Sequence, residues 1–327
     1  IYALLALALV LVFAVTRVIF IPQGEFVAYG ALTLAAFQAG KTPGTLWLLL
    51  GACVLVALID TVMAVRAGSL GRLKRIALWD LALPAAIAGL VLFLEPGKLP
   101  LWVQVGLALA IVIPLGPLIY RLAYQPVVEA SVLVLLIVSV AVHLPLVGLG
   151  LLFFGAEGSR TTPFSEAQFN LGMLTVNGQT LWVLGASGVL IVALYLFFGR
   201  SLYGKALRAT AINRVGARLM GISTTMAGKL SFTLAAGIGA LSGILIAPIT
   251  TVYYDTGFLV GLKGFVAAII AGLVSYPLAA AGAILVGLLE AFSSFWASAF
   301  KEVIVFTLII PVLLWRSLTS HHVEEEE

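Results

Sequence analysis

The chain has 327 residues, of which 62% are hydrophobic and only 10% are charged, and its formal net charge is +4 at pH 7. A soluble domain carries about 25% charged residues, so this composition excludes a water-soluble globular protein. Apolar runs of the length that a bilayer-spanning helix needs recur along the sequence. The expected fold class is an all-α integral membrane protein, a polytopic transmembrane helix bundle of about 10–11 hydrophobic segments, some of them short, broken or re-entrant.

The first apolar stretch contains residues that break helices. Residues 1–20 are predicted to form a span, the string Ile-Pro-Gln-Gly-Glu at 21–25 to break it, and residues 26–39 to form a second apolar run. Pro and Gly at membrane depth leave backbone groups without partners unless protein or water satisfies them. The break is therefore expected to line a polar path through the bundle, and an ordinary turn at the membrane surface is the alternative.

A helical hairpin is predicted over residues 46–94, from two apolar runs that flank the basic stretch 66–75. The basic stretch is expected on the cytoplasmic side, where Lys and Arg collect. Asp60 and Asp80 lie on this hairpin. Because an acid within a span costs roughly 3 kcal/mol, each has a function or a partner, unless it lies near a helix end.

The next two spans are predicted at residues 101–119 and 131–154. A short cytoplasmic link, residues 120–128, joins them and carries Arg121. His143 lies near the middle of the second span. A lone His in a span more often bonds a neighbouring helix than a metal, and no second His or Cys follows at ligand spacing, so no metal site is predicted.

The segment from Arg200 to Ile222 is a long polar interruption between two apolar runs. Its basic residues have no acid to neutralise them, so it is expected in water on the cytoplasmic side. Asn213 is expected to cap a short helix and Gly221 to end it in a left-handed turn, which leaves about two turns or roughly 10 Å. A helix of that size fits a groove on another protein. The basic residues are Arg200, Lys205, Arg208, Arg214 and Arg218.

The helix predicted at residues 230–253 carries a small residue at every fourth position: Ala235, Gly239, Gly243 and Ala247. Such a ridge lets another backbone approach closely, so we expect it to pack against another helix of this chain or of a partner. Runs at 261–275, 279–295 and 303–315 complete the bundle, and the first of them is too short to span without tilting.

Inner and outer segments then alternate so that the inner loops hold most of the Lys and Arg, as the positive-inside rule requires. Residues 157–179 form a polar external loop. Residues 1–320 make one transmembrane domain, and residues 321–327 a disordered acidic tail whose two His need no metal. The inner basic residues are Arg66, Arg121, Arg200 and Arg316, and the outer ones are Lys41, Lys98, Arg160 and Lys301.

Four strings in the second half of the chain form a recognisable pattern. They are Gly204-x-x-x-Arg208-Ala209, Ala-Arg-Leu-Met-Gly-Ile at 217–222, Gly-Leu-Lys-Gly-Phe-Val-Ala-Ala-Ile-Ile at 261–270 and Leu-Leu-Glu-Ala-Phe-Ser-Ser at 288–294. Shorter strings at 2–6, 23–25, 120–126 and 157–160 extend it over most of the chain. In this order and spacing the strings resemble the LivH-type permeases of branched-chain amino acid ABC importers.

The resemblance implies two sets of functional residues. A zwitterionic amino acid needs a polar, weakly binding route, for which the candidates are Gln23, Gly24, Glu25, Glu290, Ser293 and Ser294. The alternative is that these side chains only tie helices together. In such importers a short cytoplasmic helix fits a cleft of the ATPase; within residues 200–227 the candidates are Arg208, Asn213, Arg214, Val215, Ala217, Arg218, Leu219 and Gly221.

The resemblance also implies partners. These are a second permease of the LivM type, two cytoplasmic ATPase subunits that hold ATP and Mg, and a periplasmic binding protein, in the lipid bilayer of a bacterial inner membrane. This chain itself is expected to be no enzyme, to carry no cofactor and to bind no nucleic acid. Gly228-Lys229-Leu230-Ser231 only imitates the end of a phosphate-binding loop. The hairpin 46–94 looks like an insertion relative to the family.

Two other functions remain as alternatives. One is a secondary transporter that works alone, with Asp60 or Glu290 as a proton site. The other is an intramembrane serine protease, because Gly185-Ala-Ser187-Gly188 matches the G-x-S-G string of rhomboid proteases. A nucleophilic Ser needs its base within hydrogen-bond reach, and the only later His residues lie in the tail.

Overall fold

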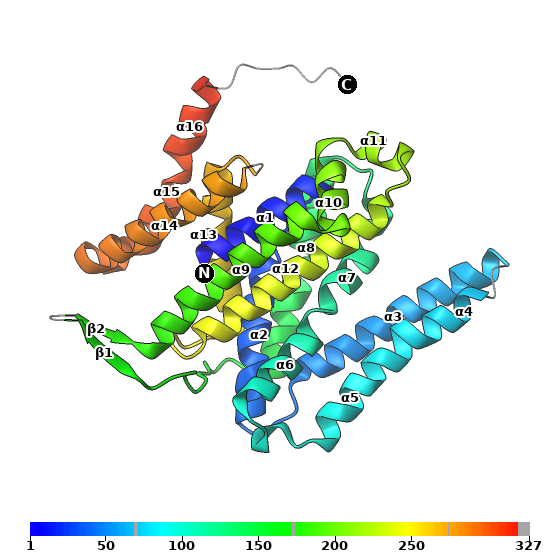
Figure 1. Ribbon diagram of the computed structural model, residues 1–327, viewed down its shortest axis with the longest axis horizontal. Coiled ribbons are helices and arrows are strands. Elements are labelled where there is room, and N and C mark those ends of the chain that lie inside the picture. Colours follow the sequence, from blue (N-terminus) through cyan, green and yellow to red (C-terminus); the bar gives the residue numbers. More distant parts are fainter. Residues whose placement is uncertain (69–70, 172–173, 274, 320–327) are drawn as a thin grey trace.

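The protein is almost entirely helical in the computed structural model, which describes residues 1–68, 71–171, 174–273 and 275–319 (Figure 1). Within these residues, seven helices are long and apolar enough to cross a membrane, and three shorter apolar helices accompany them. The expected all-α, multi-pass bundle is therefore confirmed. The long helices are Gly44–Arg66, Leu101–Val127, Val132–Phe154, Gly178–Arg200, Thr224–Ile246, Tyr276–Trp296 and Ser298–Trp315.

Four helices form the centre of the bundle, in which α1 and α2 each contact the other two: α1 (Tyr2–Thr16), α2 (Gln23–Gln38), α12 (Thr224–Ile246) and α13 (Thr256–Ile270). In Figure 1 they lie between α3 and α5 on one side and α14 to α16 on the other. Every residue of α1 from Leu4 to Val12 is buried. A helix that is apolar all round is stable in such a fully enclosed position.

The break after α1 is present, but the predicted position is wrong. α1 ends at Thr16, and Arg17 adopts a left-handed conformation with φ 62° while its N–H donates to Phe13. α2 then begins at Gln23, directly after Pro22. Residues 23–25 therefore form the first turn of α2, and the break consists of residues 17–22.

α3 (Gly44–Arg66) and the helical rod that follows it form the predicted hairpin. The rod consists of α4 (Gly71–Ile76), a π-helical stretch (Ala77–Ala82) and α5 (Leu83–Phe93). The prediction of a loop over 66–75 is wrong from Gly71 onward, and residues 69–70 lie outside the described part. Leu73 packs with Ile76 against Ala57 and Ala64 of α3, which extends the rod beyond the apolar run.

The next span is longer than predicted. α6 (Leu101–Val112) and α7 (Leu115–Ile119) continue through a π-helical turn (Tyr120–Tyr124) and a 3-10 turn (Gln125–Val127). The prediction of a link outside the helix at 120–128 is therefore wrong for residues 120–127. The rings of Tyr120 and Tyr124 each lie 5.1 Å from the ring of Phe232 in α12, and these contacts hold the extension on the bundle.

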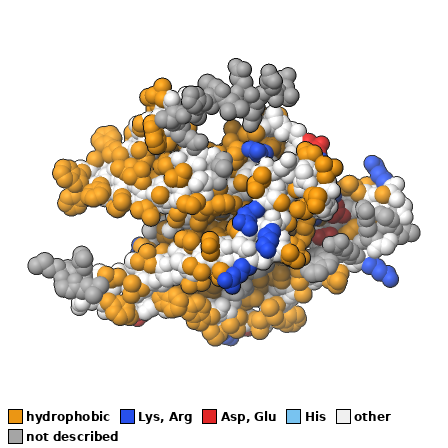
Figure 2. Space-filling view, turned by 45° about the horizontal axis from the view of Figure 1, so that its top comes forward, with side chains coloured by type: hydrophobic (Ala, Val, Ile, Leu, Met, Phe, Trp, Pro, Cys, Tyr) orange, Lys and Arg blue, Asp and Glu red, His pale blue; other side chains and the backbone are white. Residues whose placement is uncertain are grey.

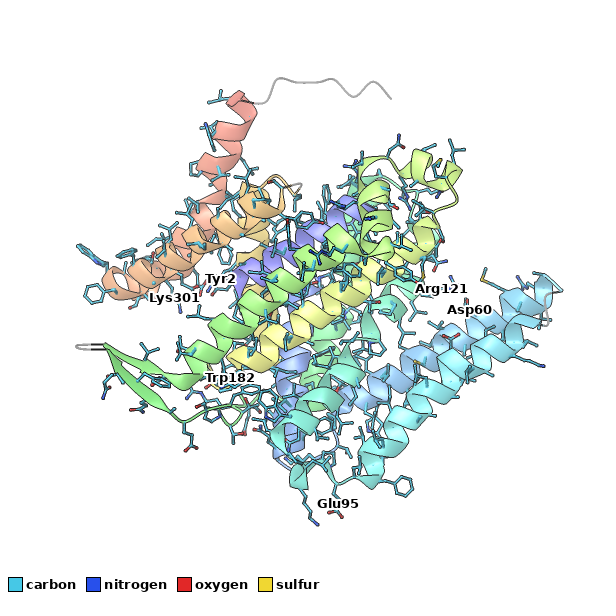
Figure 3. All side chains as sticks on the ribbon, in the orientation of Figure 1. Tyr2, Asp60, Glu95, Arg121, Trp182 and Lys301 are labelled. Atoms are coloured by element: carbon cyan, nitrogen blue, oxygen red, sulfur yellow. The ribbon has the colours of Figure 1, made fainter. Side chains whose placement is uncertain are left out.

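One ion pair joins the hairpin to this extension. Arg121 donates from Nε to Oδ1 of Asp60 over 3.1 Å and makes a second contact through Nη2 (Figure 3). The two side chains are only 13% and 25% exposed. Asp60 therefore has a partner, as the cost of an intramembrane acid required.

We expect Asp60→Asn to lower the free energy of unfolding by about 1–2 kcal/mol, because Arg121 would remain largely desolvated without a counter-charge. The melting temperature of the purified protein in detergent measures this effect. The control is Glu95→Gln, which removes the exposed Lys98–Glu95 pair at the hairpin's other end and should change the melting temperature little. Equal effects of both substitutions would contradict a role of Asp60 in holding the hairpin.

The remaining helices lie around this centre. α8 (Val132–Phe154) begins at the cap Ser131, and α9 (Gly178–Arg200) leads to two short helices, α10 (Leu202–Ile212) and α11 (Arg214–Leu219). α14 (Tyr276–Trp296) packs on α13 and is followed by a 3-10 turn (Ser298–Phe300), α15 (Lys301–Thr307) and α16 (Ile309–Thr319). The predicted tail, residues 321–327, lies outside the described part.

The predicted external loop contains an antiparallel hairpin of β1 (Gln168–Leu171) and β2 (Leu174–Asn177). An isolated bridge from Ser159 to Val252 and hydrogen bonds between Gln38 and Thr162 tie this loop to the ends of α12 and α2. In Figure 1 the hairpin and the pair α10–α11 lie at opposite ends of α9. The polar loop and the basic segment are thus on opposite sides of the bundle, as predicted.

Candidate functional site

α12 packs its ridge of small residues against α2. All four members are buried: Ala235, Gly239, Gly243 and Ala247. A Cβ added to Gly243 would lie 1.9 Å from the carbonyl oxygen of Val27, and one added to Gly239 would lie 2.7 Å from the Cβ of Phe26. The predicted close approach of a backbone is present, and the partner is a helix of this chain.

The N-terminus of α2 lies inside the bundle, beside the middle of α12. The side-chain amide of Gln23 donates to the carbonyl oxygen of Ala235 over 2.9 Å. Phe20, in the break, packs its ring 4.7 Å from that of Phe232, one turn away on α12. α2 is therefore a short helix that begins within the apolar interior, as expected of a broken segment.

Gly24 lies where α2 crosses α13. A Cβ added to Gly24 would lie 1.9 Å from the carbonyl oxygen of Gly257 and 3.1 Å from the Cα of Gly261. The N-termini of α2 and α13 thus meet with no side chain between them. Gly24 was predicted to line the substrate path, but in this conformation the backbone of α13 fills the space beside it.

Glu25, in the first turn of α2, is completely buried. Its Oε1 lies 3.1 Å from Nδ1 of His143, which is near the middle of α8. Neither carboxylate oxygen makes a hydrogen bond of good geometry with any described residue. The structure therefore places Glu25 opposite a His of another helix, as the sequence suggested for His143.

Two further groups shape the surroundings of this pair. Asp255, the residue before α13, adds a second negative charge close to Glu25. Both acids lie at helix N-termini, whose partial positive charge favours a carboxylate. The ring of Phe258 lies 4.7 Å from that of His143 and covers one side of it.

A second polar cluster lies between α1, α13, α14 and α15. Nζ of Lys263 is 2.5 Å from Oε1 of Glu290 and 3.1 Å from Oε1 of Glu302, and the hydroxyl of Tyr2 donates to Oε2 of Glu290 over 2.5 Å. Lys263 is only 5% exposed. Because both oxygens of Glu290 have partners, this carboxylate ties helices together in the present conformation.

The structure thus separates the six predicted pathway residues into two groups. Gln23, Gly24 and Glu25 lie on α2, whereas Glu290, Ser293 and Ser294 lie on α14. α13 contacts both helices. Ser293 is buried and Ser294 is exposed on the outer face of α14. Of the two groups, the one on α2 holds the buried side-chain oxygens that lack a hydrogen-bond partner among the described residues, those of Gln23 and Glu25.

The short helix of the basic segment forms with the predicted caps. Oδ1 of Asn213 accepts from the N–H of Gly216 over 2.8 Å. At the other end Gly221 adopts a left-handed conformation with φ 80°. The N–H of Gly221 donates to the carbonyl oxygen of Arg218, and the N–H of Ile222 donates to the carbonyl oxygen of Ala217. These two hydrogen bonds form a Schellman motif. α11 is shorter than the two turns expected, and α10 precedes it as a separate helix.

Contacts with the body of the protein fix one face of α11. Arg214 donates to the carbonyl oxygen of Val128 over 3.3 Å, and Arg218 contacts Glu129 over 2.8 Å and Thr224 over 3.2 Å. The hydrogen bond from Arg218 lowers the pKa of the Glu129 carboxyl below its usual value. This contribution is present at neutral pH and disappears as the pH falls through the lowered pKa, and it is small because Glu129 is fully exposed.

The opposite face of α11 is apolar and has no contacts within the described chain that bury it. Val215 and Leu219, one turn apart, are 68% and 83% exposed, and Met220 is 83% exposed. Figure 2 shows Lys and Arg side chains (blue) gathered across the middle of the face that is turned forward. The exposed basic residues of the segment are Arg200, Lys205, Arg208 and Arg218. An apolar patch among basic residues is typical of a protein interface.

At the far end of α9, a polar hollow of about 430 Å³ lies between the β-hairpin and Pro248 and Ile249, which follow α12. Arg160, Glu166, Gln168 and Asn177 are among the residues that line it. The β-hairpin, which supplies part of its lining, lies at the opposite end of α9 from α10 and α11 (Figure 1). The two ends of the bundle therefore present surfaces of different chemistry.

These features define a multi-pass membrane permease, with helices that start inside the bundle and a capped, exposed helix on the basic side. Residues 75–313 match the family model described as the permease component of branched-chain amino acid transport systems. The chain therefore belongs to this family. The match contains His143, Lys263, Glu290 and the basic segment, and it begins after α3.

Individual relatives agree with this assignment. The high-affinity branched-chain amino acid transport system permease protein LivH of Escherichia coli K12 is 32% identical over 216 residues, which cover 63% of this chain and 70% of the relative. LivH of Salmonella typhimurium is 30% identical over 205 residues, 60% of this chain and 66% of the relative. BraD of Pseudomonas aeruginosa is 28% identical over 228 residues, 67% and 74% of the two chains. No solved structure gives a significant match.

The alternative functions find no support in this geometry. His143 lies against Glu25 and not against Ser187, which is on α9. Asp60 and Glu290 are both held by basic side chains. The comparisons favour the permease over a protease or a secondary transporter.

Sequence reasoning assigned no site role to His143, Tyr2 or Glu302. The available signal for His143 was that the sequence holds one His within a span and an acid, Glu25, within another apolar run. From the sequence, Lys263 either neutralises a local acid or marks the outer boundary, and the structure pairs it with Glu290 and Glu302.

Proposed function

We propose that this chain is one permease of an ATP-driven importer in a bacterial inner membrane and that it carries branched-chain or related amino acids. A second permease of the LivM type, two cytoplasmic ATPase subunits and a periplasmic binding protein complete the assembly. The family match and the names of the relatives support the transport role. The observation that carries the partner assignment is the exposed apolar face of α11 on the basic side.

The coupling residues act in two ways. Arg214 and Arg218 hold α11 on the permease, whereas Val215 and Leu219 face outward and enter a cleft of the ATPase. When ATP closes the ATPase dimer, α11 moves with its partner, and the permease pair changes which side its cavity faces. This is a population shift, because the ATPase binds the two permease states with different affinity.

At the opposite end, the polar hollow beside the β-hairpin receives the binding protein. Its lining carries both signs of charge, in Arg160 and Glu166, so it suits a polar docking surface. The substrate then passes along the face that contains Glu25. ATP and Mg are held by the ATPase subunits and not by this chain.

The test is purification of a tagged version of the chain from its native membrane, followed by reconstitution in lipid vesicles. We expect ATPase subunits and a second permease to co-purify, and uptake of leucine to stop with vanadate but to continue with an uncoupler while ATP is supplied. Uptake that resists vanadate and stops with the uncoupler would show a secondary transporter and overturn the proposal.

A further inference from the structure

The Glu25–His143 pair is a buried polar pair in the bundle interior whose hydrogen bonding is incomplete. The Glu25 side chain is 0% exposed and that of His143 is 13% exposed. Their atoms approach to 3.1 Å, yet both carboxylate oxygens and Nδ1 of His143 lack a well-aligned hydrogen bond to any described residue. A buried carboxylate in this state is costly unless a partner with complementary charge binds it.

The surroundings specify the charge of that partner. The positive ends of α2 and α13 are already complemented by Glu25 and Asp255. Asp255 adds its negative charge near Glu25, so the surroundings of the Glu25 carboxylate suit an ammonium group. The ring N–H of His143 is a donor, which suits a carboxylate.

The contact between α8 and α2 can open without disturbing the centre of the bundle. α8 is largely exposed, with Leu135, Ser139, Leu146 and Gly150 as its buried residues. Its polar contacts with α2 are the His143–Glu25 pair and, one turn further, the hydroxyl of Tyr29 donating to Leu146 over 2.6 Å. Pro145 lies between these two contacts in α8. Proline has no N–H to donate within the helix, and helices commonly bend at such a residue.

We propose that a zwitterionic amino acid binds between Glu25 and His143 when α8 moves away from α2, with its ammonium on the Glu25 carboxylate and its carboxylate on the imidazole N–H of His143. This inference rests on the proposed function and deepens it, because it names the place where this chain holds its substrate. In the present conformation the two side chains hold each other and close the site. In each transport cycle the contact between Glu25 and His143 is replaced by one contact of each side chain with the ligand. The contact between the two side chains forms again when the ligand leaves.

The experiment uses the complete importer in lipid nanodiscs, without the binding protein, and radiolabelled leucine at equilibrium. The competitors are leucinamide, which keeps the ammonium but has no carboxylate, and leucic acid, which keeps the carboxylate but has a hydroxyl in place of the ammonium. Both compete with leucine in the wild type. Charge-assisted hydrogen bonds of this kind are worth about tenfold or more in affinity.

The expected result is a crossed pattern. Glu25→Gln weakens leucine binding and abolishes competition by leucinamide, while leucic acid still competes. His143→Ala abolishes competition by leucic acid, while leucinamide still competes. His143→Gln keeps an N–H donor, so leucic acid competes again in this variant. Tyr29→Phe is the matched control, since it removes the other polar contact between α2 and α8 and should leave both competitors effective.

Other patterns overturn the inference. If neither competitor displaces leucine from either variant, the Glu25–His143 pair only stabilises the fold. If both competitors displace leucine from both variants as they do from the wild type, the ligand binds elsewhere. In both cases, uptake of leucine by the wild-type importer with ATP would show that the proposed function still stands. A wild-type complex that assembles but takes up no amino acid would instead refute the proposed function.

Discussion

Replacing Val215 with Asp is expected to abolish ATP-driven uptake while the protein still inserts into the membrane. Val215 is 68% exposed on the outward face of α11, beside Leu219. In the proposed assembly this face enters a cleft of the ATPase, and a carboxylate there would be buried without a partner. Hot-spot residues of interfaces contribute about 2 kcal/mol or more, which corresponds to roughly 30-fold in affinity. The introduced carboxylate would also have to lose its water in the cleft, and this desolvation cost adds to the loss of affinity.

The measurements are uptake in reconstituted vesicles and the amount of ATPase that co-purifies with the chain. Two control variants separate docking from topology. Val215→Leu keeps an apolar side chain and should preserve uptake. Val215→Lys keeps the segment basic, so it would be harmless if the segment only oriented the protein in the membrane, and it should be inactive if α11 docks. Normal uptake by the Asp and Lys variants would refute the coupling role.

Features set by neighbouring residues were predictable from the sequence. The caps Asn213 and Gly221 were identified correctly because a capping hydrogen bond and a left-handed turn depend on a few adjacent residues. The ridge on α12 was identified because spacing alone places its four residues on one helix face. The apolar runs gave the spans for the same reason.

Features set by distant residues were not predictable. The break lies closer to the N-terminus than predicted, because α1 ends where Arg17 adopts the left-handed conformation. Arg has no special turn propensity, so the sequence does not indicate this position. Residues 120–127 became helical because Tyr120 and Tyr124 pack on Phe232 of a distant helix. No local pattern indicates such contacts.

The same limit applies to the candidate site. Glu25 and Glu290 looked equivalent in the sequence, as two intramembrane acids in motifs of one family. The structure gives Glu290 partners for both oxygens, from Lys263 and Tyr2, and leaves those of Glu25 incompletely bonded. Only the three-dimensional pairing separates a structural carboxylate from one that is free to bind a ligand.

The packing of α2 on α12 leads to the second large effect, which we expect for Gly243→Ala. The added Cβ would lie 1.9 Å from the carbonyl oxygen of Val27 and 3.0 Å from its Cα. Overpacking costs about 1–3 kcal/mol where side chains can move, and here the neighbour is backbone, so we expect a loss above about 3 kcal/mol. Because α2 carries Gln23 and Glu25, the displacement would also move the candidate site.

Gly237→Ala is the matched control on the same helix, because a Cβ at Gly237 meets no atom nearer than 3.7 Å and is in ordinary contact with Ile113. Both substitutions add one methyl group to the interior of α12, where Ala forms helix better than Gly by about 1 kcal/mol. Gly237→Ala should therefore leave the melting temperature in detergent unchanged or raise it, whereas Gly243→Ala should lower it sharply and reduce the yield of folded protein. Since helix propensity favours both variants equally, any difference between them measures the approach of α2 to α12, and equal melting temperatures would mean that the two backbones do not pack this closely.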